Sequence, residues 1–415
     1  MNKQFIKKYG TLLLLAAGAG IIFQLPYIRE TFYVSIQNAM GLSNVQMGML
    51  SSGYATMATL SYFVGGIVAD KFSARKLLTF SFIATGILGL WFSTFPSFNV
   101  SRIIFVLMGI TTIITYWSAC IKATRMLGDS SEQGRLFGLQ EGLRGIMNAI
   151  LVFVMMAAFN HFTDKVVGTA WAIRTCAITV IIIGVLNWFF IEDTKTESQT
   201  ESIASVAKGM FQSLKIPRVW LLCGIVFTAY SLYGLLGYIN TYAIKVYGAS
   251  EQTGVTLGAI RYIIQAFGGI VGGFLADRIG SRIKVIVGSV ALLGLSFLSY
   301  IILPVQDGLV NMVIANFILG LFLIYIIRSL YFAIIDDAGI PVEKTGRVSG
   351  FVSCLGYTPD IFMYTMVGGW MDSHAGKAGF NMMFVYAAVM AILCIILALI
   401  LNTVIKKSKN RIEQA

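Results

Sequence analysis

Basic residues inside long apolar stretches are the first sign of chemistry in this sequence. There are six of them: Arg29, Lys122, Arg144, Arg174, Arg261 and Arg328. Acidic residues in the same stretches are fewer, namely Glu30, Glu141 and Asp360, with Asp336 and Asp337 at the end of one stretch. A charge at the centre of a membrane helix costs about 2.5–3.5 kcal/mol on insertion scales. Because two or three positive charges remain without a carboxylate, we expect an anionic ligand, which a guanidinium can hold with two parallel hydrogen bonds.

The six positions are not equivalent. Arg174 lies close enough to a stretch end for its side chain to reach the headgroups, and Lys122 is open to either interpretation. Glu141 and Arg144 are three residues apart and can neutralise each other on one helix face. Asp360 can pair with Arg261 or with Arg328, and the sequence leaves both pairings open.

The composition determines the class of protein. The 415 residues are 57% hydrophobic and 12% charged, whereas a soluble protein is about 45–50% apolar and 25% charged. This excludes a soluble globule, a disordered chain and a coiled coil. The apolar stretches are continuous, as in Ile178–Ile191 and Val385–Ile405, which favours helices over the alternating strands of a membrane β-barrel. We therefore predict an all-α polytopic membrane protein.

Interruptions by charged and turn residues predict twelve transmembrane helices in two pseudo-symmetric six-helix bundles. The predicted spans are 9–37, 45–69, 77–95, 99–123, 134–160, 168–191, 217–246, 252–276, 285–303, 309–336, 346–371 and 380–405. The first bundle is 1–191, and the second is 217–405. A polar cytoplasmic linker, 192–216, joins them and is expected to hold a short amphipathic helix at 202–214. A tail, 406–415, follows the last span.

The Lys and Arg residues predict the orientation. With the N-terminus inside, 21 of the 31 basic residues fall in cytoplasmic segments, and four fall in external connections: Arg102, Lys165, Lys245 and Lys377. This asymmetry predicts that both termini are cytoplasmic, in a bacterial inner membrane. The net charge of +12 is then a topology signal, and no nucleic-acid partner is expected.

Two short motifs recur at nearly constant offset. Gly65–Arg75 (GGIVADKFSAR) returns as Gly272–Arg282 (GGFLADRIGSR), 207 residues later, and Gly134–Gly138 returns as Gly346–Gly350, 212 residues later. Such a duplication predicts a substrate cavity near the bilayer midplane and transport by alternating access. We expect Asp70 and Arg75 to form a charge pair that breaks during the cycle. The alternative is that this cluster only anchors the topology.

The duplicated motif resembles that of the major facilitator superfamily. The residues that carry the resemblance are Gly66, Asp70 and Arg75, with their repeats Gly273, Asp277 and Arg282. It covers essentially the whole chain and implies the twelve-helix, two-bundle fold and secondary transport. Helices one, four, seven and ten line the cavity in that superfamily, which implies Arg29, Lys122 and Arg328 as ligands. Arg261 ranks second, and Tyr33, Tyr116, Tyr233 and Asn240 are expected to complete the site.

A narrower resemblance concerns the first span. Tyr27–Phe32, followed by Gly41, Ser43 and Gly48, looks like the first-helix region of the organophosphate:phosphate antiporters and related organic-anion transporters. This resemblance implies that Arg29 binds the anion. The second arginine of that group, in helix seven, has no counterpart here, where Leu232 and Tyr233 stand instead. The cargo therefore need not be phosphorylated.

Other kinds of chemistry find little support. The five cysteines show no CxxC spacing, there are two histidines, and the sequence has no nucleotide-binding P-loop. We expect no enzyme activity, no metal and no cofactor.

The leading hypothesis is a monomeric secondary transporter of a small organic anion, namely a carboxylate, a sugar acid or a phosphate ester. An inside-negative potential opposes anion entry by about 2.3 kcal/mol per charge per 100 mV. Uptake therefore needs either protons, carried by Asp360 or Glu141, or a counter-anion. The alternatives are an exporter of amphipathic or cationic compounds and a transporter-like membrane sensor.

Overall fold

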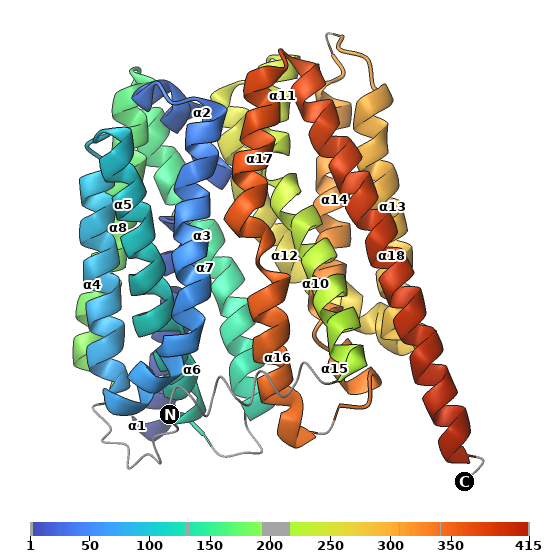
Figure 1. Ribbon diagram of the computed structural model, residues 1–415. Helices are drawn as coiled ribbons and strands as arrows, with labels where there is room; N and C mark the ends of the chain where they lie inside the picture. Colours follow the sequence, from blue (N-terminus) through green and yellow to red (C-terminus); the bar gives the residue numbers. More distant parts are fainter. Residues whose placement is uncertain (1–2, 129–132, 193–215, 307, 341, 414–415) are drawn as a thin grey trace. The chain divides into compact units, whose positions relative to one another are not determined.

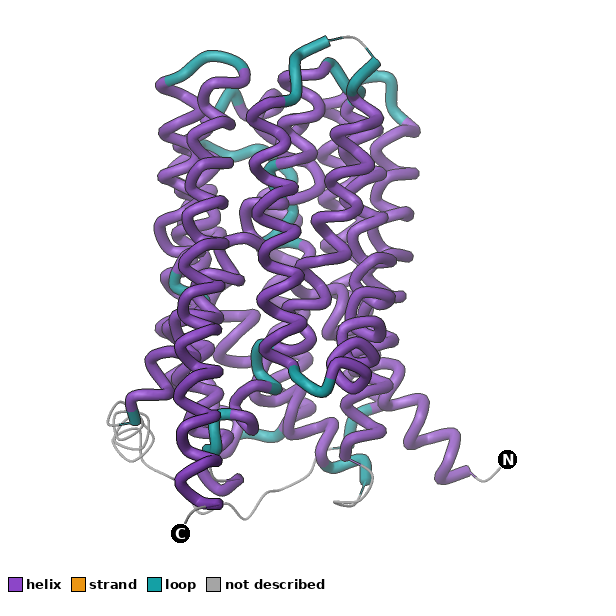
Figure 2. Tube along the Cα trace, turned by 90° about the vertical axis from the view of Figure 1, so that its right-hand side faces the viewer, coloured by secondary structure: helices purple, strands orange, loops and turns teal. Residues whose placement is uncertain are grey.

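The computed structural model describes residues 3–128, 133–192, 216–306, 308–340 and 342–413. Within these ranges every regular element is a helix, as Figure 2 shows. Contacts between Cα atoms divide the chain into two compact units. Unit 1 is Met1–Ile203 with Ser250–Ile263, and unit 2 is Ala204–Ala249 with Ile264–Ala415.

Unit 1 is built from the helices of the first half of the chain (Figure 1). They are α1 (Lys3–Ile21), the 3₁₀-helix η1 (Ile22–Gln24), α2 (Arg29–Met40), α3 (Asn44–Lys71), α4 (Ala74–Phe92), α5 (Phe98–Gly109), the π-helix η2 (Ile110–Trp117), α6 (Ser118–Arg125), α7 (Gln133–His161) and α8 (Lys165–Phe190). The start of α12 (Glu251–Ile279) joins them.

Close helix packing in unit 1 depends on small residues. α4 packs on α8, α3 on α5 and α1 on α7. At Gly86 of α4, a Cβ atom would lie 2.8 Å from the Ala177 carbonyl oxygen of α8, and at Gly184 of α8 it would lie 2.8 Å from Phe82 Cβ. Small residues let membrane helices approach in this way, because lipid supplies no hydrophobic force between them.

The first span is broken where the chain passes Pro26. α1 gives way to η1 and then to a turn before α2 begins at Arg29. Proline lacks the N–H that would continue the helical ladder, and a break inside a span needs protein around it. The residues from Arg29 to Ile36 are accordingly buried. The break places Arg29 and Glu30 in the first turn of α2.

The fourth span contains a feature that the sequence did not reveal. Ile110–Trp117 forms a π-helix between α5 and α6, and its carbonyl groups have shifted partners. Ser81 donates to the Thr111 carbonyl, and the Thr85 hydroxyl donates to Thr111 Oγ1 at 2.7 Å. These buried hydroxyls compensate for the disturbed ladder.

Unit 2 holds the remaining helices. They are α10 (Pro217–Leu236), α11 (Ile239–Tyr247), the rest of α12, α13 (Arg282–Ile302), α14 (Val310–Leu330), α15 (Ile334–Asp337), α16 (Val342–Gly356), α17 (Pro359–Ser373) and α18 (Lys377–Glu413). α18 packs on α10 and α13, and α14 packs on α13. A stacked pair of rings, Tyr300 and Phe384, with Tyr242 edge-on to both, fills this core.

The all-α membrane class predicted from composition is confirmed. Ten helices among the described residues are long and apolar enough to cross a membrane. Two further predicted spans fall on α3 and on α16 with α17, and the count of twelve stays a prediction. The helix expected at 202–214 lies outside the described residues. The boundaries 1–191, 192–216, 217–405 and 406–415 also stay a prediction; by contacts, Ser250–Ile263 groups with the first half.

Candidate functional site

Arg328 stands at the end of α14, surrounded by tyrosine side chains of unit 2. Its guanidinium carbon lies 3.9 Å from the centre of the Tyr233 ring and 5.9 Å from that of Tyr230. Both rings come from α10, where three-residue spacing places them on one helix face. The Arg328 side chain is half-buried. Among the side chains that the structure describes, no carboxylate lies within ion-pair distance of it.

The same tyrosines connect Arg328 to a buried acid. The Tyr230 hydroxyl donates to Asp360 Oδ2 at 2.8 Å, and Asp360 is 3% exposed. Asp360 occupies the first turn of α17 because Pro359 starts that helix. Tyr357, just before this start, places its ring 4.4 Å from that of Tyr230. The result is a polar cluster in which a cation, phenol groups and a carboxyl group meet.

A second cationic cluster lies in unit 1. Arg261 of α12 donates through Nη1 to Glu30 Oε2 of α2 at 2.5 Å, and the two side chains are 4% and 6% exposed. This contact answers a question that the sequence left open, since Asp360 was one candidate partner of Arg261. Both side chains are deeply buried, so losing one partner would leave the other charge in a place that water does not reach.

Arg29 precedes this pair and is also buried, at 4% exposure. Its guanidinium carbon lies 6.0 Å from the Tyr33 ring centre. Arg29 lines a small cavity with Ser51, Phe92 and Phe105. The Tyr33 hydroxyl donates to Asn44 Oδ1 at 3.1 Å, which holds the ring in place.

The other predicted ligands have local contacts within their units. Lys122 Nζ donates to the Ala69 carbonyl at 2.7 Å, near the end of α3. The Tyr116 hydroxyl donates to Cys120 Sγ at 3.2 Å, and Arg144 lies 5.8 Å from the Phe23 ring centre. Asn240 is 5% exposed in α11. The place of these residues in a binding site stays a prediction.

For three of the predicted residues the structure does not describe the side-chain position. They are Glu141, Gly66 and Asp70. The pairing of Glu141 with Arg144 and that of Asp70 with Arg75 therefore lie outside the described part of the chain. Arg75 itself lies 4.9 Å from the Trp188 ring centre.

In the second copy of the duplicated motif, the arginine pairs with an acid outside the motif, whereas the arginine of the first copy was expected to pair with the aspartate of its own motif. Arg282, at the start of α13, donates to the Ala333 carbonyl at 3.0 Å and to Asp337 Oδ1 at 3.1 Å. Asp277 is exposed, and a Cβ atom at Gly273 would meet nothing within 4 Å. In this copy the arginine ties the start of α13 to the chain after α14.

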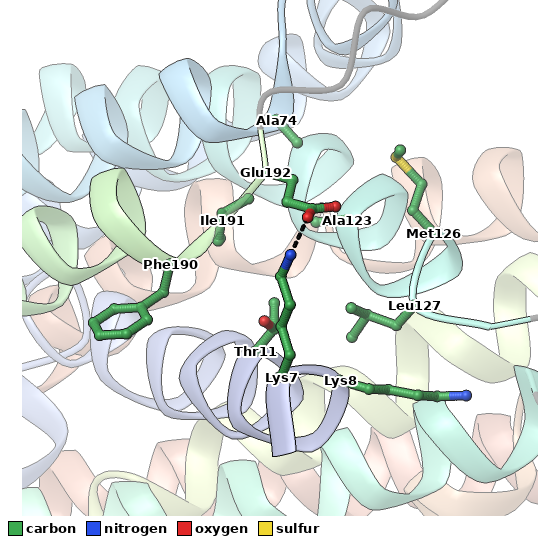
Figure 3. A pocket seen from close by; sticks show the side chains of 10 residues that line it. All are labelled: Lys7, Lys8, Thr11, Ala74, Ala123, Met126, Leu127, Phe190, Ile191 and Glu192. Carbon is green, nitrogen blue, oxygen red and sulfur yellow. Dashed lines mark hydrogen bonds and ion pairs between the residues drawn. The ribbon is translucent and has the colours of Figure 1, made fainter. Parts of the chain in front are cut away.

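A separate cavity opens at the ends of α1, α4, α6 and α8 (Figure 3). It encloses about 230 Å³, and Lys7 forms an ion pair with Glu192 across it. Apolar side chains make up most of its wall, including Leu127, Phe190 and Ile191. Both charges of this pair are largely exposed, so the pair contributes little to stability.

The structure also adds residues that the sequence did not single out. Tyr357 and Tyr331 belong to the Arg328 cluster, with their hydroxyls 3.3 Å apart. Their signal in the sequence was weak, because tyrosines are common in apolar spans. For metal binding, the described residues contain no group of three or more His, Cys, Asp or Glu side chains that could hold an ion.

Comparison with known proteins agrees with this architecture. The family model of the Major Facilitator Superfamily matches residues 9–362. Inner membrane protein YqcE of Escherichia coli (strain K12) is 31% identical over 382 residues, covering 90% of this chain and 89% of that protein. The hexuronate transporter of Bacillus subtilis (strain 168) is 23% identical over 388 residues, covering 87% of each.

Solved structures share the fold at low sequence identity. The inward-facing, occupied form of a bacterial homolog of the human lysosomal transporter Spinster aligns with a TM-score of 0.74 at 16% identity, over 98% of both chains. The family match covers most of the chain, and the relative from Bacillus subtilis is named as a transporter. The chain is therefore a membrane transporter that belongs to the Major Facilitator Superfamily.

Proposed function

We propose that this transporter moves a small organic anion, such as a carboxylate, a sugar acid or a phosphate ester, by alternating access. The observation that carries the proposal is Arg328, whose guanidinium rests on Tyr233 at 3.9 Å and has no carboxylate at ion-pair distance among the described side chains. A half-buried cation inside a membrane span is costly when it has no fixed counter-charge, and an anionic cargo reduces that cost.

The aromatic wall favours a sugar acid among these anions. Tyr230, Tyr233 and Tyr357 present ring faces and hydroxyls next to Arg328. A sugar ring can pack its C–H groups against such faces and use its hydroxyls for hydrogen bonds. Its carboxylate would pair with the guanidinium of Arg328. The hexuronate transporter among the relatives supports this choice of cargo.

The proposal includes the setting of the protein. We propose that both termini lie in the cytoplasm, because most basic residues are then on the inner side of the membrane. We also propose an inner-membrane location, since the relative YqcE is named an inner membrane protein. The transporter is proposed to act as a monomer. Transport against the membrane potential requires coupling to protons or to a counter-anion.

A thermal-shift panel tests the cargo and the site together. The purified protein is heated with glucuronate, gluconate, glycerol 3-phosphate and a quaternary amine, alongside Arg328→Ala, Arg29→Ala and the control Arg174→Ala. Arg174 of α8 donates to Ser93 Oγ at the end of α4 and lies outside the proposed site. Stabilisation by an anion that persists in Arg174→Ala but disappears in Arg328→Ala supports the proposal. Stabilisation by the amine alone, or by anions equally in all variants, contradicts it.

A further inference from the structure

The buried acid Asp360 reaches the proposed cargo site through a tyrosine, and the proposed function leaves it without a role. The Tyr230 hydroxyl donates to Asp360 Oδ2 at 2.8 Å, and the two residues are 7% and 3% exposed. The guanidinium carbon of Arg328, to which we assign the cargo carboxylate, lies 5.9 Å from the centre of the same Tyr230 ring. Tyr230 therefore lies next to both the acid and the proposed anion site.

A break between two helices holds the acid in this position. α16 ends at Gly356, and Pro359 begins α17, so Asp360 lies in the first turn of α17. The Asp360 N–H donates to the Tyr357 carbonyl at 3.2 Å, and the Tyr357 ring lies 4.4 Å from that of Tyr230. A carboxylate is favoured in the first turn of a helix, because the N–H groups there carry partial positive charge. Backbone and ring contacts thus hold the carboxyl group against the Tyr230 hydroxyl.

The hydrogen bond to Asp360 determines what else the Tyr230 oxygen can bind. A phenol hydroxyl has one proton to donate, and its oxygen has lone pairs that accept. Because the proton is directed to Asp360, any further partner of this oxygen must be a donor. An ionised carboxylate has no proton to donate, whereas a hydroxyl group has one. The part of a cargo that Tyr230 can recognise is therefore a hydroxyl group rather than the acid group.

We propose that Tyr230, with its proton held by Asp360, accepts a hydrogen bond from a hydroxyl of the cargo and so selects hydroxylated carboxylates over carboxylates without hydroxyls. The inference rests on the proposed function and deepens it by naming a residue that determines specificity. Arg328 binds the carboxylate, and Tyr230 reads a hydroxyl on the same molecule. Asp360 is a positioning residue, because it acts on the cargo only through the direction of the Tyr230 hydroxyl.

Two ring acids that differ in their hydroxyls test the inference. Glucuronate and tetrahydropyran-2-carboxylate share the oxygen-containing ring and the carboxylate, but only glucuronate carries ring hydroxyls. The Kd of tetrahydropyran-2-carboxylate divided by that of glucuronate should fall about tenfold in Tyr230→Phe, as the loss of one hydrogen bond implies. The lost contact with Asp360 affects both complexes alike and cancels in this ratio. The control Tyr300→Phe removes a buried hydroxyl that donates to the Val313 carbonyl, and it should keep the wild-type ratio.

Two substitutions of Asp360 test its positioning role. In Asp360→Leu the acceptor is gone, so the Tyr230 hydroxyl is free to donate to the cargo, and the ratio should fall as it does in Tyr230→Phe. In Asp360→Asn the amide oxygen can still accept from Tyr230, so the ratio should stay near that of the wild type. A thermal scan shows whether each variant is folded. If Asp360→Leu is not, Tyr230→Phe still decides the question.

The results that overturn the inference differ from those that overturn the proposed function. A ratio that is unchanged in Tyr230→Phe, or that falls equally in Tyr300→Phe, overturns the inference, as does equal affinity of the wild type for the two acids. Binding of glycerol 3-phosphate without binding of glucuronate also overturns it. In each of these cases an anion still binds, so the proposed function stands. The proposed function fails only when no anion of the panel binds, and the inference then fails with it.

Discussion

Replacing Arg328 with alanine should weaken anion binding strongly while leaving the empty protein intact. A bidentate contact between a guanidinium and a carboxylate combines two charge-assisted hydrogen bonds, each contributing about 1.5–3 kcal/mol. Arg328 is half-buried, and solvent weakens such a contact, so we take about 3 kcal/mol for the two hydrogen bonds together. The Kd should then rise about 100-fold, since each 1.4 kcal/mol is a factor of ten. Lysine at this position keeps the charge but loses the fork and the stacking on Tyr233, so we expect about a tenfold loss.

The stability of the ligand-free protein separates this role from a structural one. Arg328 makes no ion pair among the described side chains. Its removal loses a cation–π contact of about 0.5–2 kcal/mol and removes the cost of a half-buried charge. The apparent Tm of Arg328→Ala should therefore change by less than about 3 °C. Calorimetric titration with the stabilising anion gives the Kd, and a thermal scan gives the Tm. A Kd within twofold of the wild type would refute the reasoning, as would a collapse of the Tm.

Three further predictions follow from contacts in the two units. Gly86→Ala should destabilise the protein by about 1–3 kcal/mol, because the added Cβ would lie 2.8 Å from the Ala177 carbonyl oxygen. The control Gly288→Ala should be neutral or slightly stabilising, since a Cβ there has nothing within 4 Å. Equal Tm values for the two variants would contradict this prediction. Arg282→Gln should lower the rate of uptake without changing the Kd, because it breaks the contacts with Ala333 and Asp337. Substitution of the exposed Arg278 by glutamine is the control. A changed Kd in Arg282→Gln would count against a purely conformational role. Green fluorescent protein fused after Ala415 should fluoresce, as a cytoplasmic C-terminus requires, whereas an active alkaline phosphatase fusion there would reverse the orientation.

The fold class could be predicted from the sequence because it depends on amino-acid composition and on the lengths of the apolar stretches, both of which can be counted. The apolar fraction and the length of the apolar stretches predicted a helical membrane protein, and the duplicated motif ending at Arg75 and Arg282 indicated the family. The π-helix at Ile110–Trp117 was not predicted, because a shift of one residue in hydrogen bonding leaves no mark on hydropathy. Its compensating donors, such as Ser81, come from another helix.

The charged residues inside the apolar stretches can be found from the sequence, but their partners cannot. Arg261, Arg328, Glu30 and Asp360 were identified from charge inside apolar stretches. Which acid meets which base depends on helix rotation and on the break near Pro26, and the spacing along the chain determines neither. Glu30 was therefore counted as an available acid, but its pairing with Arg261 emerged only from the structure.

Counterflow in proteoliposomes tests the central claim most directly. Vesicles loaded with unlabelled glucuronate are diluted into labelled glucuronate, and the label inside is followed for the wild type and for Arg328→Ala. We expect transient, saturable accumulation by the wild type and none above empty vesicles by the variant. Binding of glucuronate without any flux, or equal flux by both proteins, would contradict an organic-anion transporter centred on Arg328.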